Sequence, residues 1–210
     1  MNKLTRVSVM LAAFAICSLP GLGQSAPTAK PSILDKMDFG LTYSYKWVKI
    51  STTNGPEHGI QGGSVDAVYN IGGKYKGLGI AIDASGDSAS ALNPGVDLSQ
   101  FTIVAGPRYT VHQTKADSPK ATGYVQALVG YVHAFDSVFP STPPAPGGTY
   151  SVLTTSNSVA LQLGGGFSLP ITKHFGYRVA ELDYIYTRLG NNNNNFQNDI
   201  RLTTGLTVHF

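Results

Sequence analysis

The 210-residue sequence predicts an all-β fold, an eight-stranded antiparallel up-and-down transmembrane β-barrel. Three observations predict it. Apolar and small polar residues alternate along eight segments, and the last of these ends on the aromatic Phe210. Charged residues make up only 13% of the chain, against about 25% in an ordinary soluble protein. Successive side chains of a strand point to opposite faces, so each segment has one apolar and one polar face.

Residues 1–26 have the order of a secretory signal peptide. Basic residues precede an apolar run over residues 7–22, and small residues follow at Ser25 and Ala26, which is the pattern of a cleaved signal. Pro20 shortens the run below the roughly 20 apolar residues that a spanning helix needs. The only cysteine lies inside this signal, so the mature chain is expected to form no disulfide and no cysteine-based site.

Residues 27–36 are interpreted as a short periplasmic lead-in, and residues 37–210 as the barrel domain. The segments with the pattern of strands are 37–50, 60–70, 77–85, 98–111, 121–133, 157–169, 177–189 and 198–210. These lengths suit a bilayer, which needs roughly 9–11 tilted residues per strand. Because the number of strands is even, both ends of the barrel domain are expected on the same side of the membrane.

In the first four strands, large apolar or aromatic residues alternate with small or polar ones. The residues expected on the outer face are Phe39, Leu41, Tyr43, Tyr45, Trp47, Val65, Ala67, Tyr69, Leu78, Ile80, Ile82, Phe101, Ile103, Ala105 and Tyr109. Their neighbours in sequence, such as Gly40, Ser64 and Gly79, are then expected to line the interior. Several tyrosines and the tryptophan lie near strand ends, as in the aromatic girdles of membrane proteins.

The last four strands differ in how clearly they alternate. The fifth is the least regular, with Val125 and Val129 placed outward and Gln126 and Leu128 inward. The sixth and eighth are the clearest, with outward residues Val159, Leu161, Leu163, Phe167, Leu169, Ile200, Leu202, Leu206 and Val208. The seventh sets Ala180, Leu182, Tyr184 and Tyr186 against an inner face of Val179, Glu181, Asp183 and Ile185.

The connections between the strands alternate in kind. Those after the first, third, fifth and seventh strands are polar and mostly longer; the longest covers residues 134–155, and the last contains five consecutive asparagines. Shorter turns are expected at Gly72-Gly73, near residues 117–119 and at residues 170–175. Long loops on one rim and short turns on the other are typical of barrels in bacterial outer membranes.

A soluble ligand-binding barrel would also have one apolar and one polar face, with the apolar face inside. Here the polar face carries too little charge to form a water-exposed surface, which favours the membrane barrel. A basic residue that faces lipid at mid-depth costs about 2–4 kcal/mol, so the few strand charges are expected to pair in the lumen. They are Lys46, Asp66, Asp83, Arg108, Glu181, Asp183 and Arg201.

Three short motifs stand in order along the strands: Gly106-Pro107-Arg108-Tyr109, Gly164-Gly165-Gly166 and Asp183-Tyr184. Together with the signal, the eight alternating strands and the terminal Phe210, they resemble the OmpA-like family of small outer-membrane barrels over roughly residues 37–210. The resemblance implies that Phe210 and its strand are read by the barrel-assembly machinery. No peptidoglycan-binding domain follows the barrel, so the resemblance does not imply anchoring to the cell wall.

Arg108, Glu181, Asp183 and Arg201 form the sharpest candidate site, a charge network in the lumen. One interpretation is a gate that opens a small pore when the ion pairs switch partners. The other is a static network that fills the barrel. An eight-stranded barrel has an interior only just wide enough for side chains, and buried charges need partners. These two arguments favour the static plug.

The five histidines are candidates for catalytic residues or metal ligands. Some outer-membrane barrels modify lipid A with a His, a Ser and an acid near one rim, and His133 lies close in sequence to Asp136 and Ser137, as His58 does to Glu57. No spacing resembles those enzymes, and no two histidines lie at ligand spacing. The sequence therefore predicts no catalytic residue, no metal site and no cofactor.

The expected function is that of an integral protein of a Gram-negative outer membrane with a structural or surface-interaction role. We expect a monomer that contacts outer-membrane lipid and lipopolysaccharide, with its lumen plugged by side chains. A narrow, low-conductance channel is the alternative, and a lipid-A-modifying enzyme is less favoured. The formal net charge of +3 is too small to indicate a nucleic-acid partner.

Overall fold

The computed structural model describes residues 33–49, 57–72, 77–93, 96–112, 121–140, 152–189 and 196–210. The expected signal peptide, most of the lead-in, the turn near residues 117–119 and the asparagine run lie outside these ranges. Residues 33–210 form one compact unit. No helix within the described ranges is long and apolar enough to span a membrane.

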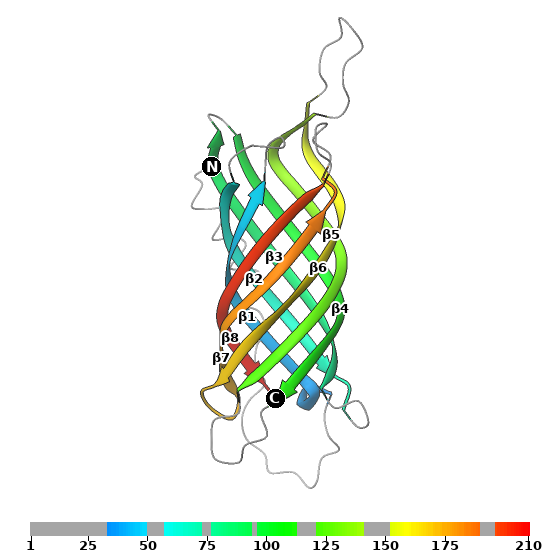
Figure 1. Ribbon diagram of the computed structural model, residues 1–210, viewed down its shortest axis with the longest axis vertical. Helices are drawn as coiled ribbons and strands as arrows, with labels where there is room; N and C mark the ends of the chain where they lie inside the picture. The colour runs from blue at the N-terminus through cyan, green and yellow to red at the C-terminus, as the bar shows by residue number, and fades with distance from the viewer. Residues whose placement is uncertain are drawn as a thin grey trace, which may run out of the picture. The chain divides into compact units, whose positions relative to one another are not determined.

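Eight antiparallel strands close into a barrel in sequence order, from β1 round to β8 and back to β1 (Figure 1). The strands are β1 (Met37–Lys49), β2 (Glu57–Asn70), β3 (Leu78–Asn93), β4 (Val96–His112), β5 (Thr122–Pro140), β6 (Val152–Pro170), β7 (Phe175–Thr187) and β8 (Gln197–His209). A single 3-10 turn, η1 (Leu34–Lys36), precedes β1. The predicted eight-stranded up-and-down barrel is confirmed.

The barrel has two different ends. β1 begins and β8 ends at the lower end in Figure 1, which we call the turn end; the opposite end is the loop end. Residues 171–174 form the tight turn between β6 and β7, where the backbone N–H of Ile171 donates to the carbonyl of Phe175 at 2.9 Å. Gly72 and Gly77 flank the turn between β2 and β3 with φ of 38° and 89°, a backbone region that favours glycine.

Three strands are six or seven residues longer than the sequence predicts, and β2 and β4 are each three residues longer. β3 continues to Asn93, and β5 and β6 extend to Pro140 and from Val152 into the expected loop at 134–155. These extensions still pair with their neighbours, as Phe139 does with Leu153. These extensions lack the clean alternation of apolar and polar residues, which is why the sequence does not predict them. Their pairing rests on backbone hydrogen bonds.

The predicted alternation of faces is present in seven strands and in most of β7. The side chains expected outward are at least partly exposed on the outer surface, for example Leu41, Ile82 and Val129. The residues between them are buried inside the barrel, including Leu128 beside Val129. In an ordinary soluble protein this distribution would leave a continuous apolar surface in water, whereas lipid accommodates it.

One side chain of β7 contradicts the prediction. Val179 was expected on the inner face with Glu181, but it is 40% exposed on the outside. The register explains the difference: Arg178 pairs with Gly205 and Glu181 with Thr203, so β7 holds one residue more than β8 across this interval. This β-bulge turns both Val179 and Ala180 outward and brings Arg178 to the inside.

The seam between the first and last strands is held at the turn end by polar and aromatic contacts. His209 Nδ1 lies 2.8 Å from Asp38 Oδ1, and the amide of Asn70 donates to Asp38 Oδ2 at 2.8 Å. Phe210 follows the last residue of β8 and packs edge-on against Phe39 with ring centroids 5.9 Å apart. These contacts tie β1, β2 and β8 together where the barrel closes.

Candidate functional site: the charged lumen

The interior of the barrel holds ten buried charged side chains among the described residues. Four are basic and six are acidic: Lys46, Arg108, Arg178, Arg201, Asp66, Asp83, Asp87, Glu181, Asp183 and Asp199. Each occupies an inward position of its strand. They fall into three groups along the barrel, the turn-end, middle and loop-end clusters.

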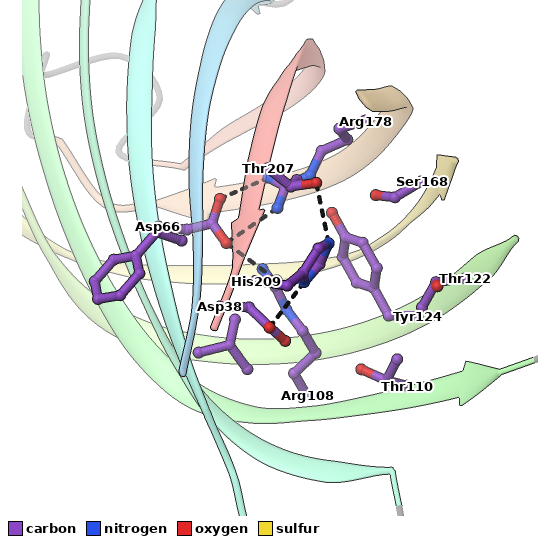
Figure 2. Close-up of a pocket in the computed structure, with 12 residues that line it drawn as sticks. Asp38, Asp66, Arg108, Thr110, Thr122, Tyr124, Ser168, Arg178, Thr207 and His209 are labelled. Carbon is purple, nitrogen blue, oxygen red and sulfur yellow. Dashed lines mark hydrogen bonds and ion pairs between the residues drawn. The ribbon is translucent and has the colours of Figure 1, made fainter. Parts of the chain in front are cut away.

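The turn-end cluster joins two arginines to two carboxylates. Asp66 accepts from Arg178 Nη1 at 2.6 Å and Nη2 at 3.0 Å, and from Arg108 Nη1 at 3.1 Å (Figure 2). Arg178 Nη1 also reaches Glu181 Oε2 at 2.8 Å. Arg178 and Glu181 are three residues apart, and only the bulge in β7 lets both point inward. Gly40 permits this packing, because an added Cβ there would collide with Asp66 and crowd Arg178.

Neutral side chains complete the turn-end cluster. Gln126 Oε1 accepts from Arg108 Nε at 2.9 Å and Nη2 at 2.7 Å, while its amide nitrogen donates to Glu181 at 2.6 Å. The Tyr124 hydroxyl donates to Glu181 Oε2 at 2.7 Å, and the Arg108 guanidinium lies 4.2 Å from the centre of the Tyr124 ring. Gln126 thus connects Arg108 to Glu181 although the two charges form no direct ion pair.

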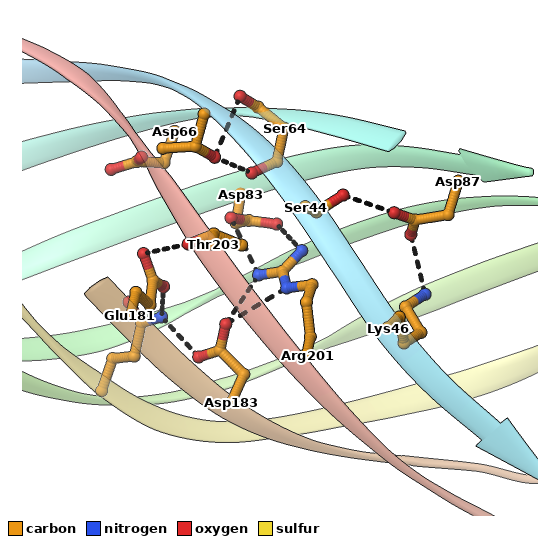
Figure 3. Close-up of polar contacts among 12 residues, drawn as sticks. Ser44, Lys46, Ser64, Asp66, Asp83, Asp87, Glu181, Asp183, Arg201 and Thr203 are labelled. Carbon is orange, nitrogen blue, oxygen red and sulfur yellow. Dashed lines mark hydrogen bonds and ion pairs between the residues drawn. The ribbon is translucent and has the colours of Figure 1, made fainter. Parts of the chain in front are cut away.

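In the middle cluster one arginine holds two carboxylates (Figure 3). Arg201 Nη1 and Nη2 donate to the two oxygens of Asp83 at 3.1 and 3.2 Å. Its Nη2 and Nε donate to Asp183 Oδ2 at 2.9 and 3.2 Å. All three side chains are at most 1% exposed, and they come from β8, β3 and β7.

The loop-end cluster contains Lys46, Asp87 and Asp199. Lys46 Nζ lies 2.8 Å from Asp87 Oδ2 and donates to Gln100 Oε1 at 3.2 Å, while the Ser44 hydroxyl donates to Asp87 Oδ1 at 2.5 Å (Figure 3). An apolar group that includes Val48, Ile60, Leu98, Val132 and Leu189 packs inside the barrel. The first four come from strand positions towards the loop end, and Leu189 follows the end of β7.

The structure brings together some of the four residues that the sequence singled out. Asp183 and Arg201 form a direct ion pair, whereas Arg108 pairs with Asp66 and Glu181 with Arg178. Sequence reasoning missed Arg178, Asp87 and Asp199. Asp199 lies two positions before Arg201 and so shares its face, a signal that was present. The inward position of Arg178 depends on the bulge in β7, which regular alternation does not predict. Asp87 lies beyond the predicted end of its strand.

A cavity of about 40 Å³ lies at the turn end. Asp38, Asp66, Arg108, Arg178 and His209 line it together with hydroxyl-bearing side chains and Tyr124 (Figure 2). Its volume suits a few water molecules.

The histidine candidates do not form a catalytic group in the part of the chain that the structure describes. His133 Nδ1 bonds to the Asn157 side chain, and its ring stacks on Phe135 with centroids 5.5 Å apart. The structure does not describe the side chains of four further candidates, Glu57, His58, Asp136 and Ser137. No group of three or more His, Cys, Asp or Glu side chains among the described residues is arranged to hold a metal ion.

Comparison with solved structures identifies proteins with the same fold. The crystal structure of Neisserial surface protein A (NspA) is similar with a TM-score of 0.61 and 20% identity, covering 83% of this chain and 97% of that one. Ail, the attachment invasion locus protein of Yersinia pestis, gives 0.53 and 15% over the same shares. A further Ail structure, in complex with the heparin analogue sucrose octasulfate, gives 0.50 and 16%. At these identities the likeness shows the fold alone.

No family model and no curated protein matches the sequence.

Proposed function

We propose that this protein is an integral outer-membrane β-barrel with a structural or surface-interaction role and a lumen closed by side chains. One observation carries the proposal: the apolar residues are exposed outside the barrel and the charged residues are buried within it. This is the reverse of a soluble protein, and it fits a barrel surrounded by lipid. The fold shared with NspA and Ail supports the same placement, as does the resemblance to the OmpA-like family.

The proposed plug rests on how completely the interior is filled. Each of the three clusters joins strands that are not neighbours in the sheet, through ion pairs between β1 and β3, β3 and β8, or β2 and β7. Apolar side chains, among them Ile60 and Leu128, fill interior space beside them. Moving an ion through would require breaking buried ion pairs, each of which leaves an uncompensated charge in a low dielectric.

Conductance in planar bilayers tests the plug. We expect the refolded barrel to insert without steady ionic current, because an ion could pass only if buried ion pairs of the clusters broke. Incorporation is verified independently, by protease protection of the inserted chain in liposomes of the same lipid. A reproducible unitary conductance would contradict the plug and favour the narrow channel, in which Arg178, shared between Asp66 and Glu181, would switch partners.

The surface-interaction role is proposed for the loop end. The long loops that the sequence predicts there lie mostly outside the described residues, and loops on a rigid scaffold are where binding residues concentrate. Binding of cells expressing the protein to host-matrix and polysaccharide arrays would test the role. Loss of binding after shortening the loops, with the barrel still assembled, is the expected result; unchanged binding would contradict it.

Residues 1–26 are proposed as a cleaved signal and residues 27–36 as a lead-in, so the turn end faces the periplasm. N-terminal sequencing of the mature protein tests this directly. We further propose that the barrel is a monomer in contact with lipopolysaccharide.

Phe210 is proposed as part of the signal for the barrel-assembly machinery. Its ring is about half exposed and touches Phe39 at the seam, so a machine that acts before closure could reach it. Deleting Phe210 should lower the amount of assembled, heat-modifiable protein in the outer membrane without lowering synthesis. Phe196→Ala, which also removes an exposed aromatic ring, serves as the control. Equal assembly of the two variants would contradict this role.

A further inference from the structure

The charges in the lumen do not balance. The turn-end cluster sets Arg108 and Arg178 against Asp66 and Glu181 and is neutral. In the middle cluster a single guanidinium faces two carboxylates, but it donates hydrogen bonds to both of them. The loop-end cluster also has one cation for two carboxylates. Its cation, Lys46, forms an ion pair with Asp87, and the described residues show no such pair for Asp199.

Asp199 is the carboxylate that lacks a partner. Its side chain lies on the inner face of β8 and the residue is only 2% exposed, yet its Oδ1 has no hydrogen-bond partner among the described residues. The nearby ammonium group of Lys46 is already taken by Asp87 and Gln100. Lys46 attracts the Asp199 charge from a distance and Asp87 repels it.

An uncharged side chain in the same row of the barrel also lacks hydrogen-bond partners among the described residues. Gln162 on β6 is fully buried, and neither its amide oxygen nor its amide nitrogen has a partner in the described structure. Gln162 pairs with Ile185 on β7, and Ile185 pairs with Asp199 on β8. The three therefore share one row across the sheet, and all three face the lumen. Buried polar atoms are almost always bonded, so two such exceptions in one row call for a missing partner.

We propose that the loop-end cluster binds one alkali-metal cation, with the carboxylate of Asp199 as the charged ligand and the amide oxygen of Gln162 as a neutral one. Hard cations prefer carboxylate and carbonyl oxygens, and carbonyl oxygens alone can replace the hydration shell of K⁺. A cation here compensates the second carboxylate, as Arg201 does in the middle cluster. The site lies in the lumen and does not depend on the proposed surface role.

Unfolding of the refolded barrel in detergent tests the inference without any substitution. Sodium or potassium chloride is exchanged for N-methylglucamine chloride at constant ionic strength and pH, because this bulky cation cannot enter a filled lumen. Above the dissociation constant, each tenfold rise in Na⁺ or K⁺ should raise the folded-to-unfolded ratio tenfold. The same unfolding midpoint in all three salts would overturn the proposal.

Substitutions locate the effect. Asp199→Asn keeps the shape of the side chain and should abolish the dependence on Na⁺ and K⁺, whereas Asp38→Asn at the turn end should retain it. A dependence that survives in Asp199→Asn would place the cation elsewhere and overturn the assignment. If Asp199→Asn does not refold, ²³Na NMR of the unmodified protein provides the test. Broadening of the ²³Na line that added K⁺ reverses supports the site, and a line that is not broadened overturns it. Conductance is measured separately, so failure here leaves the plug proposal untouched.

Discussion

At the scale of single residues, Arg201 illustrates how the lumen is organised. One guanidinium donates four hydrogen bonds, two to Asp83 and two to Asp183. Asp83 lies 118 residues away in sequence, in the lumen on β3, which does not pair with β8. The planar fork of arginine can satisfy two carboxylates at once, which lysine cannot do with the same geometry. This one charged side chain on β8 therefore binds to side chains of β3 and β7 at the same time.

Replacing Arg201 by methionine should destabilise the barrel by about 3–5 kcal/mol, because it leaves two buried carboxylates without a cation. The free energy of unfolding, measured in urea with refolded protein, checks this. Arg188→Met is the control, since Arg188 is exposed and only covers the ring of Phe196 at 5.0 Å; there we expect less than about 1 kcal/mol.

A triple variant separates charge from packing. Asp83→Asn and Asp183→Asn, added to Arg201→Met, remove all three charges and should recover most of the lost stability. If Arg201→Met alone costs no more than Arg188→Met, the middle cluster contributes nothing and the description of the lumen is wrong.

Seven of the ten buried charges of the lumen could be predicted from sequence, but their pairings could not. A charge on the face that alternates with lipid-facing residues must point inward, which located Asp66, Asp83, Arg108 and Arg201. The partner of each charge depends on strands that meet only across the closed barrel, as Asp66 and Arg178 do from 112 residues apart. No local pattern contains that information.

At the scale of elements, the bulge in β7 determines one of these pairings. Arg178 and Glu181 could not both face inward in a regular strand, since side chains alternate with period two. The extra residue at Val179–Ala180 resets the alternation, and the ion pair at 2.8 Å follows. The sequence predicted that this strand exists, but an apolar pair such as Val179-Ala180 fits either face and does not reveal the bulge.

Deleting Val179 should therefore be tolerated. The deletion makes β7 equal in length to its neighbours across this interval and keeps both Arg178 and Glu181 on the inside. Deleting Val129 from β5, in a part of the strand whose register with both neighbours is regular, instead shifts the side chains that follow to the opposite face. We expect the first variant to refold to a heat-modifiable species on gels and the second to remain unfolded. Refolding of both, or of neither, would contradict the account of the bulge.

At the scale of the whole molecule, large apolar side chains lie on the exposed surface and charged side chains lie in the interior, the reverse of a soluble protein. Adjacent residues of β5 show this directly, because Val129 is 54% exposed and Leu128 only 2%. The strand order, the closure and the direction of the faces, apart from that of Val179, followed from alternation and low charge. Strand ends near the loop end did not, since backbone pairing beyond the apolar band needs no apolar pattern.

The most direct measurement of this central claim is the environment of Val129. A nitroxide attached at Val129→Cys in a chain without other cysteines is reconstituted in liposomes, and its collisions with oxygen and with a water-soluble nickel chelate are compared. If lipid surrounds the barrel, oxygen, which partitions into the bilayer, should relax the label strongly and the chelate hardly at all. A label that collides freely with the chelate would show that water covers this face, and the account would be wrong.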